Sequence, residues 1–216
     1  RRQPGRNQSI TAAYGPAERK MTMISGTNRK IERLPEEKWR GVRLDFTYVT
    51  GSYYDVTLRQ EEGRFEVTFL KTPFETPRIH GSAETGEYGD CLYADWWEGA
   101  DAYGIFEAGA LIAVIELCPE RWSNRLRVTE LWVSGQHRRR GLGTHLMHFA
   151  KELAVRDQYR CLMLETQTCN EAAMAFYLAQ GFTLIGFDRC CYGNDDVSRK
   201  EVRLELGWFP EGGGNA

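Results

Sequence analysis

Residues 136–144 form a glycine turn with the sequence Gln136-His137-Arg138-Arg139-Arg140-Gly141-Leu142-Gly143-Thr144. It follows an apolar run, Val128 to Val133, and leads into apolar residues at helical spacing from Leu142 to Leu153. Two glycines at such a turn let the backbone approach a ligand closely, and the first amides of the helix lack internal partners. The stretch therefore predicts a cradle for an anion such as a diphosphate. Its arginines add cationic partners, although arginines at a strand–helix turn are also common on solvated surfaces.

A second motif follows downstream and narrows this interpretation. The run Met163 to Gln167 leads through Asn170 into a helical segment that contains Tyr177, and Gly181-Phe182 comes after it. Taken with the glycine turn, this order of residues resembles the GNAT acetyltransferase superfamily. In that family an Arg/Gln-x-x-Gly-x-Gly/Ala loop binds the pyrophosphate of acetyl-CoA. The matching residues here are Arg138, Gly141 and Gly143.

The resemblance implies acetyl-CoA as the co-substrate and assigns the residues that hold it. Backbone amides from Leu131 to Val133 are expected to meet the pantetheine amides and the thioester carbonyl. Asn170 is expected to hydrogen-bond the pantetheine arm, although an Asn at this position also serves as an ordinary helix N-cap. The expected cofactor-binding residues are Leu131, Trp132, Val133, Arg138, Arg139, Arg140, Gly141, Leu142, Gly143, Thr144, Asn170, Ala173 and Tyr177.

The chemistry that the resemblance implies is attack of a primary amine on the acetyl thioester. An amine with a pKa of about 10 is mostly protonated at neutral pH, so a base must accept its proton. Two carboxylates match family positions, Glu165 on the strand before Asn170 and Glu130 on the strand before the glycine turn, and sequence alone does not rank them. Tyr177 matches the hydroxyl that protonates the leaving thiolate. Each could instead be an ordinary strand or core residue.

Within the superfamily, the sequence looks most like the streptothricin acetyltransferases. The run Leu162 to Gln167, with Asn170 three residues on, is close to their version of the strand, and Glu120 to Asn124 resembles the segment before the preceding strand. The resemblance spans roughly residues 43 to 208. It implies that the acceptor is the beta-lysine amine of streptothricin. The first half of the chain departs more from that pattern, so the acceptor stays open at this stage.

An acidic and aromatic segment, Glu84 to Asp101, provides a separate physical indication of the acceptor. It contains six acidic residues and no Lys or Arg, interleaved with Tyr and Trp. Carboxylates attract ammonium groups, and aromatic faces hold cations once water is excluded. The segment therefore suits a cationic, polyamine-like ligand, but a solvated loop with aromatics packed inward explains it equally well. The expected substrate-binding residues are Asp90, Asp95, Trp96 and Trp97.

The ends of the chain differ from its middle in composition. Of the 28 Lys/Arg and 30 Asp/Glu residues, nine and four lie in residues 1 to 38, so the rest of the chain is acidic. Residues 1 to 38 are polar and without apolar periodicity, which is typical of a disordered or non-native leader. We expect one N-acetyltransferase domain over residues 39 to 209 and a flexible tail over residues 210 to 216.

Composition also limits the partners and the compartment. No apolar run reaches the length of a membrane span and no signal-peptide pattern opens the chain, so we expect a cytoplasmic protein without a membrane partner. The six cysteines form no Cys-x-x-Cys pair, which favours free thiols and argues against a metal site. No binding module accompanies the basic leader, so we expect no nucleic acid. The expected partner is a cationic small-molecule amine, and a homodimer is possible.

Local patterns predict an α/β (α+β) fold with a mixed, mostly antiparallel central sheet flanked by helices, as in GNAT proteins. Strand signals and turn residues alternate with two helical segments. The expected strands cover residues 43–50, 54–60, 64–70, 104–107, 111–117, 128–133, 160–166, 182–192 and 200–208, and the expected helices begin near Leu142 and after Asn170.

Three functions fit the sequence. The first is an enzyme that inactivates streptothricin by acetylating its beta-lysine amine. The second is an N-acetyltransferase for a polyamine or for an amino group of a protein. The third is a module that binds acyl-CoA without turnover, and the joint presence of Glu165, Asn170 and Tyr177 argues against it.

Overall fold

A seven-stranded sheet forms the centre of the molecule in the computed structural model, which describes residues 29–81 and 91–210. Neighbouring strands are antiparallel except for one parallel pair, β6 and β7. The expected mixed, mostly antiparallel sheet is therefore confirmed. In spatial order the strands are β1 (Glu32–Leu34), β4 (Asp101–Glu107), β5 (Ala110–Glu120), β6 (Arg125–Val133), β7 (Cys161–Gln167), β9 (Arg203–Trp208) and β8 (Thr183–Asp188).

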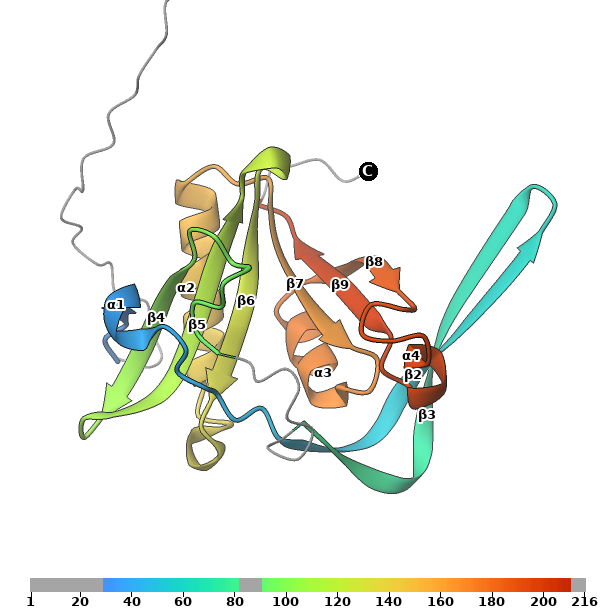
Figure 1. Ribbon diagram of the computed structural model, residues 1–216, viewed down its shortest axis with the longest axis horizontal. Helices are drawn as coiled ribbons and strands as arrows, with labels where there is room; N and C mark the ends of the chain where they lie inside the picture. The colour runs from blue at the N-terminus through green and yellow to red at the C-terminus, as the bar shows by residue number, and fades with distance from the viewer. Residues whose placement is uncertain (1–28, 82–90, 211–216) are drawn as a thin grey trace, which may run out of the picture.

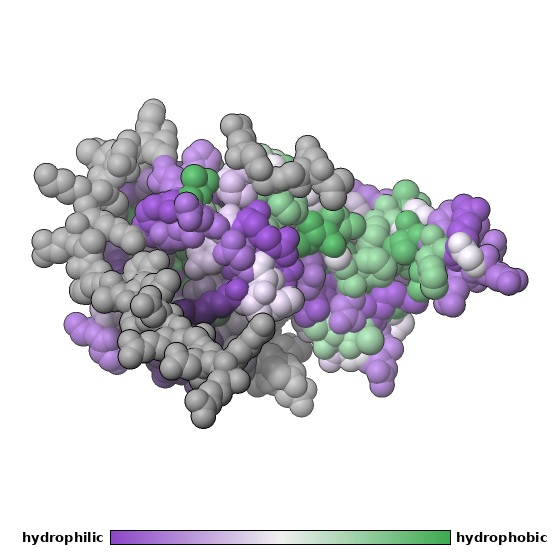
Figure 2. All heavy atoms as spheres, turned by 90° about the horizontal axis from the view of Figure 1, so that it is seen from above, coloured by the Kyte–Doolittle hydropathy of each residue, from purple (hydrophilic) through white to green (hydrophobic). Residues whose placement is uncertain are grey.

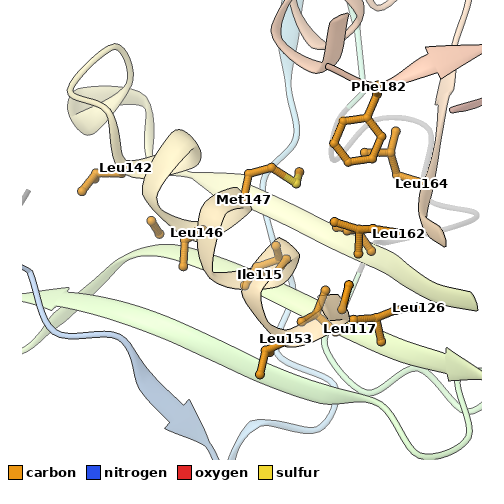
Figure 3. Close-up of a cluster of buried hydrophobic side chains, with 14 of the residues drawn as sticks. Ile115, Leu117, Leu126, Leu142, Leu146, Met147, Leu153, Leu162, Leu164 and Phe182 are labelled. Atoms are coloured by element: carbon orange, nitrogen blue, oxygen red, sulfur yellow. The ribbon is translucent and has the colours of Figure 1, made fainter. Parts of the chain in front are cut away.

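Helix α2 (Leu142–Arg156) covers one face of this sheet, and its apolar stripe forms the main core. Figure 3 shows Leu146, Met147 and Leu153 of α2 gathered in one cluster with Ile115 of β5, Leu126 of β6 and Leu162 of β7. Leu146 is fully buried, as its place in the helical pattern predicts. The remaining helices are α1 (Glu36–Trp39), α3 (Glu171–Ala179), α4 (Asp196–Arg199) and the single 3-10 turns Arg121–Ser123 and Gly135–His137.

A second, smaller core lies on the sheet face opposite α2. It contains Val114 and Cys118 of β5, which alternate with Ile115 and Leu117 of the main core, together with Leu92 and Tyr93 from the loop before β4. Because β5 is buried on both faces, it is a nearly continuous apolar run rather than an alternating one. The sheet is thus the middle layer of the fold.

Part of the expected leader belongs to the fold, which corrects the boundary predicted at residue 38. Leu34 of β1 pairs with Ala102 of β4, and both Ile31 and Leu34 are buried. The hydroxyl of Tyr93 donates a hydrogen bond to the carbonyl of Leu34. A three-residue edge strand contains too few positions to show an alternating pattern, so the sequence did not reveal it. The rest of the predicted leader, residues 1–28, and the predicted tail, residues 211–216, lie outside the described residues.

A long hairpin, β2 (Tyr48–Glu61) and β3 (Arg64–His80), makes a separate two-stranded sheet and extends away from the body (Figure 1). Gly63 occupies the turn with φ 73°, a conformation that favours glycine. The predicted hairpin is confirmed, but its strands are much longer than predicted. The strand expected from Arg43 begins only at Tyr48, and the strand expected to reach Tyr192 ends at Asp188.

Candidate active site

Strands β6 and β7 start side by side and then diverge (Figure 1). Their parallel pairing covers only residues 125–128 of β6 and 161–164 of β7. Beyond these pairs, among the strands of the described residues, β6 continues to pair with β5 and β7 continues to pair with β9. A bulge at Thr129 marks the point of divergence, because Glu116 pairs with Glu130 whereas Leu117 pairs with Val128. Backbone groups on the two facing strand edges are therefore available to an extended ligand.

The glycine turn lies directly beyond the open end of β6. Arg139 (φ 62°) and Gly141 (φ 79°) both have left-handed backbone conformations, and Gly141 is the N-cap of α2. No side chain caps this helix end. The first amides of α2 are therefore free of side-chain partners within the described chain, and they are oriented as an anion site requires.

The side chains around the turn leave its entrance polar and open. Arg138 donates hydrogen bonds to the carbonyls of Val133 (3.2 Å) and Thr47 (3.5 Å), and Arg139 and Arg140 are exposed. At Gly143 an added Cβ would lie 3.5 Å from the ring of Phe176, an ordinary contact. Packing within the chain therefore does not require glycine at position 143. Close approach of a ligand would explain the glycine instead.

Helix α3 brings the predicted Asn170 and Tyr177 to the divergent strands. Asn170 caps the helix, because its side-chain oxygen accepts a hydrogen bond from the Ala173 amide at 3.1 Å. Tyr177 is partly buried, and its ring contacts that of Phe176 edge to face, with 5.4 Å between the ring centres. Burial, and then the nearby charge of Glu130, hold the pKa of Tyr177 above its ordinary value. Tyr177 and Glu130 therefore lie within electrostatic reach, although Tyr177 comes from helix α3 and Glu130 from strand β6.

The second predicted carboxylate, Glu165, is held in an ion-pair network. Its Oε2 atom lies 3.1 Å from Nη1 of Arg127 and 3.6 Å from Nη1 of Arg203. Arg127 is almost fully buried, pairs with Glu120 at 2.6 Å and lies over the ring of Trp97. Two arginines therefore engage the carboxylate of Glu165 in ion pairs.

One component of the site was missed by the sequence analysis, a crossing segment made of residues 45–48. Trp132 of β6 donates a hydrogen bond from its indole to the carbonyl of Asp45 at 2.8 Å. The hydroxyl of Tyr48 lies 3.4 Å from both Gln167 Oε1 and Cys169 Sγ, at the end of β7. The crossing segment thus joins the separated ends of β6 and β7. The sequence pattern there looks like the start of a strand, so it carried no signal of this role.

The predicted acceptor residues are divided by the structure. Trp97 packs on the second core and contacts Arg127, so it lies next to the Arg127–Glu165 pair. Asp95 is exposed and pairs with Arg40 at 2.7 Å, and Trp96 is 68% exposed at the surface. Asp90 lies outside the described residues.

Neither a membrane span nor a metal site emerges from the described residues. Within residues 29–81 and 91–210, no helix has the length and apolar character needed to cross a bilayer. In the same ranges, no three His, Cys, Asp or Glu side chains gather in a group that could hold a metal ion. The cysteines at 118, 161, 169, 190 and 191 are free thiols, as predicted.

Comparison with known proteins agrees with this geometry. Residues 70–182, which include the divergent strands, the glycine turn and α3, match the model of the acetyltransferase (GNAT) family. The chain is also 34% identical over 180 residues to the streptothricin acetyltransferase of Escherichia coli, which covers 83% of this chain and 95% of that relative.

The chain belongs to the GNAT acetyltransferase family. It is therefore an N-acetyltransferase by family. Solved GNAT structures share its fold. A nourseothricin acetyltransferase superposes with a TM-score of 0.64 at 22% identity, covering 85% of this chain and 99% of that one. A Bacillus anthracis protein solved in complex with acetyl coenzyme A superposes with a TM-score of 0.62 at 22% identity, covering 84% and 99%.

Proposed function

We propose that this GNAT protein transfers the acetyl group of acetyl-CoA to the beta-lysine amine of streptothricin and so inactivates the antibiotic. The observation that carries the proposal is the near full-length similarity to a streptothricin acetyltransferase, in which the matched region contains the glycine turn, Asn170 and Tyr177. A shared fold alone would leave the acceptor undefined, because GNAT-like sites serve many amines.

In this proposal the glycine turn holds the pyrophosphate of acetyl-CoA. The uncapped amides at the start of α2 and the exposed Arg139 and Arg140 supply donors and positive charge. The open edge of β6 from Leu131 to Val133 faces the pantetheine amides, and the side-chain amide of Asn170 retains donors after its oxygen has capped α3. Acetyl-CoA supplies the activated acetyl carbon, and the chain supplies orientation and proton transfer. No metal takes part in this scheme.

The reaction needs one group to accept a proton and one to donate a proton. Glu130 accepts the proton of the ammonium group, directly or through water, and the neutral amine then attacks the thioester carbonyl. The new C–N bond forms as the C–S bond breaks, and Tyr177 donates its hydroxyl proton to the departing thiolate. A raised pKa suits this role, because it keeps the Tyr177 hydroxyl protonated at neutral pH.

We assign the base to Glu130 rather than Glu165 because of their neighbours. Arg127 and Arg203 engage the carboxylate of Glu165 in ion pairs. Glu130 lies close enough to Tyr177 for its charge to contribute to the raised pKa of that hydroxyl. Glu165 then serves to hold Arg127 in place.

The acceptor enters, in this proposal, on the sheet face opposite α2. Arg127 and Trp97 lie on that face, and the crossing segment spans the strand ends there. We expect Tyr48 and Trp97 to meet the cationic antibiotic, whereas the predicted Asp95 pairs with Arg40 and Trp96 lies at the surface. Aromatic rings and carboxylates are the partners that ammonium groups prefer.

A thiol-release assay with acetyl-CoA tests the acceptor class. The panel contains streptothricin, spermidine, an aminoglycoside and a peptide with a free amino terminus. We expect kcat/KM for streptothricin to exceed the others by at least about 100-fold, the selectivity that a site built around its polar groups provides. Preference for spermidine or the peptide would instead indicate an N-acetyltransferase for a polyamine or for an amino group of a protein. Binding of acetyl-CoA without turnover on any amine would indicate a module that binds acyl-CoA without catalysis. We place the enzyme in the cytoplasm, where acetyl-CoA is made.

A further inference from the structure

The outer part of the hairpin, residues 57–68, projects from the body as an arm (Figure 1). Along this arm β2 and β3 pair only with each other in the described chain. A two-stranded hairpin is marginally stable in water unless another element covers its apolar face. The order of the arm therefore depends on a surface that lies outside its own two strands.

One face of the arm is apolar. Strand alternation places Leu58, which pairs with Val67, on the same face as Phe65. At the base of the arm the next residue of this face, Phe69, contacts Phe187 of β8 edge to face, with 5.3 Å between ring centres. The apolar face of the arm is thus continuous with the body at β8.

The same apolar surface continues on β8, the edge strand of the large sheet. Leu184 pairs with Leu206 and Phe187 pairs with Leu204, so both project on the side of the main core. We name the continuous surface the apolar band. Its residues are Leu58, Phe65, Val67, Phe69, Leu184 and Phe187.

The apolar band is exposed in the single chain. Phe65 is 72% exposed, and Leu184 and Phe187 are exposed by 43% and 36%. Viewed from above, apolar side chains extend from the body along the arm, whereas the tip is hydrophilic (Figure 2). Contiguous exposed apolar surface of this kind is uncommon on a monomeric protein and marks an interaction site.

We propose that the apolar band is the contact surface for a second copy of this chain, with the arm of each copy lying along the band of the other. The apolar face of the arm requires a contact surface whenever the protein is folded. A second copy of the chain is the one partner that is always present with it. A two-fold contact uses the same patch on both chains. Because both copies contribute the apolar band, its area enters twice into the roughly 1,200–2,000 Å² that a stable interface buries.

The charges at the tip of the arm fit a copy of the same chain. Arg59 and Arg64 alternate there with Glu61, Glu62 and Glu66, so both signs are present in nearly equal number. Arg64 pairs with Glu66 within the arm at 2.7 Å. A two-fold arrangement can set Arg59 of one arm against Glu61 and Glu62 of the other. A nucleic acid or a strongly acidic protein would instead require an excess of positive charge.

Sedimentation equilibrium of the full chain tests this inference without any reference to catalysis. We expect a species of about twice the 24.8 kDa chain mass, with dissociation at low concentration. Phe65→Glu should raise the dimer dissociation constant by at least about 100-fold, because it buries a charge in the contact. Leu70→Glu is the matched control. Leu70 is 64% exposed, but it lies on the opposite face of the same strand, so this variant should dimerise normally.

Circular dichroism melting of each variant separates loss of association from loss of folding. A wild-type chain that stays monomeric at every concentration would overturn the inference. Equal dissociation of the Phe65→Glu and Leu70→Glu variants, or unchanged association of a folded Phe65→Glu variant, would also overturn it, because the apolar band would then not be the contact.

Discussion

Arg127 and Glu165 face each other across strands β6 and β7 at the point where these strands separate, with 3.1 Å between Nη1 and Oε2. The pair joins the two halves of the sheet just beyond their last shared register position. In the proposed mechanism the pair gives Glu165 a structural role, because its carboxylate is engaged by the nearly fully buried Arg127. Glu130, which lies within electrostatic reach of Tyr177, is then the base in the proposed mechanism.

Glutamine substitutions at the two carboxylates separate their roles. Glu130→Gln should lower kcat by at least tenfold, a loss of ~1.4 kcal/mol at the transition state. Glu165→Gln, its matched control, should retain most of kcat. Steady-state kinetics over a pH series measures both, and the opposite ranking would return the base to Glu165.

The Glu165→Gln variant should instead lose stability. It leaves Arg127 with Glu120 as its remaining carboxylate partner. Because Glu165 is about one-third exposed, solvent screens part of the pair, and we expect the free energy of unfolding to fall by only ~1 kcal/mol. Urea denaturation checks this value. An unchanged midpoint would mean that the ion pair does not hold the strands.

Tyr177→Phe tests the proton donor. We expect kcat to fall by at least tenfold while the Kd of acetyl-CoA stays within about twofold, since a ring of the same shape remains. The pKa of Tyr177 is raised above the ordinary value of about 10, so in the wild type this group stays protonated, and its loss of a proton should cause no fall in rate below about pH 10. Turnover of Tyr177→Phe equal to wild type would remove the hydroxyl from the mechanism.

Local signals explain why much of the fold could be predicted. The amphipathic pattern from Leu142, the glycine turn before it and the Asn170 cap each depend on residues within one or two turns of helix. Such patterns involve residues that are close together in the sequence, so they can be recognised without knowledge of the tertiary structure. The sequence therefore predicted α2, α3 and their N-termini close to where they lie.

Features that depend on distant residues escaped prediction. Arg127 and Glu165 are 38 positions apart, and only the parallel register of β6 and β7 brings them together. Trp132 and Asp45 are 87 positions apart, so the crossing segment left no local pattern. Edge strand β1 was assigned to a leader because three residues cannot show a period. The choice between Glu130 and Glu165 needed their surroundings rather than their spacing.

Gly141 carries the strongest test of the anion cradle. Its φ of 79° is costly for any other residue, and it immediately precedes the free amides of α2. Gly141→Val should raise the Kd of acetyl-CoA by about tenfold or more, because the side chain strains the turn and fills the place of the phosphate. Gly135→Val is the control, since a Cβ at Gly135 meets nothing within 4 Å. Isothermal titration measures both, and equal affinity would contradict the cradle.

Tyr48→Phe tests the acceptor side of the site. Removing the hydroxyl breaks its contacts with Gln167 and Cys169 and loosens the crossing segment from β7. We expect the KM for streptothricin to rise about five- to tenfold, the range of one lost hydrogen bond, while the KM for acetyl-CoA is unchanged. Tyr53→Phe on the hairpin is the control and should match wild type. An equal rise in both KM values would place Tyr48 in general stability rather than at the acceptor.

Mass spectrometry of streptothricin after incubation with the protein and acetyl-CoA tests both the proposed acceptor and the proposed site of acetylation. The proposed function predicts a mass increase of one acetyl group, with fragment ions that place it on the beta-lysine moiety, and no product in the absence of acetyl-CoA. Unmodified streptothricin under conditions in which another amine is acetylated, or an acetyl group on a different part of the antibiotic, would contradict it.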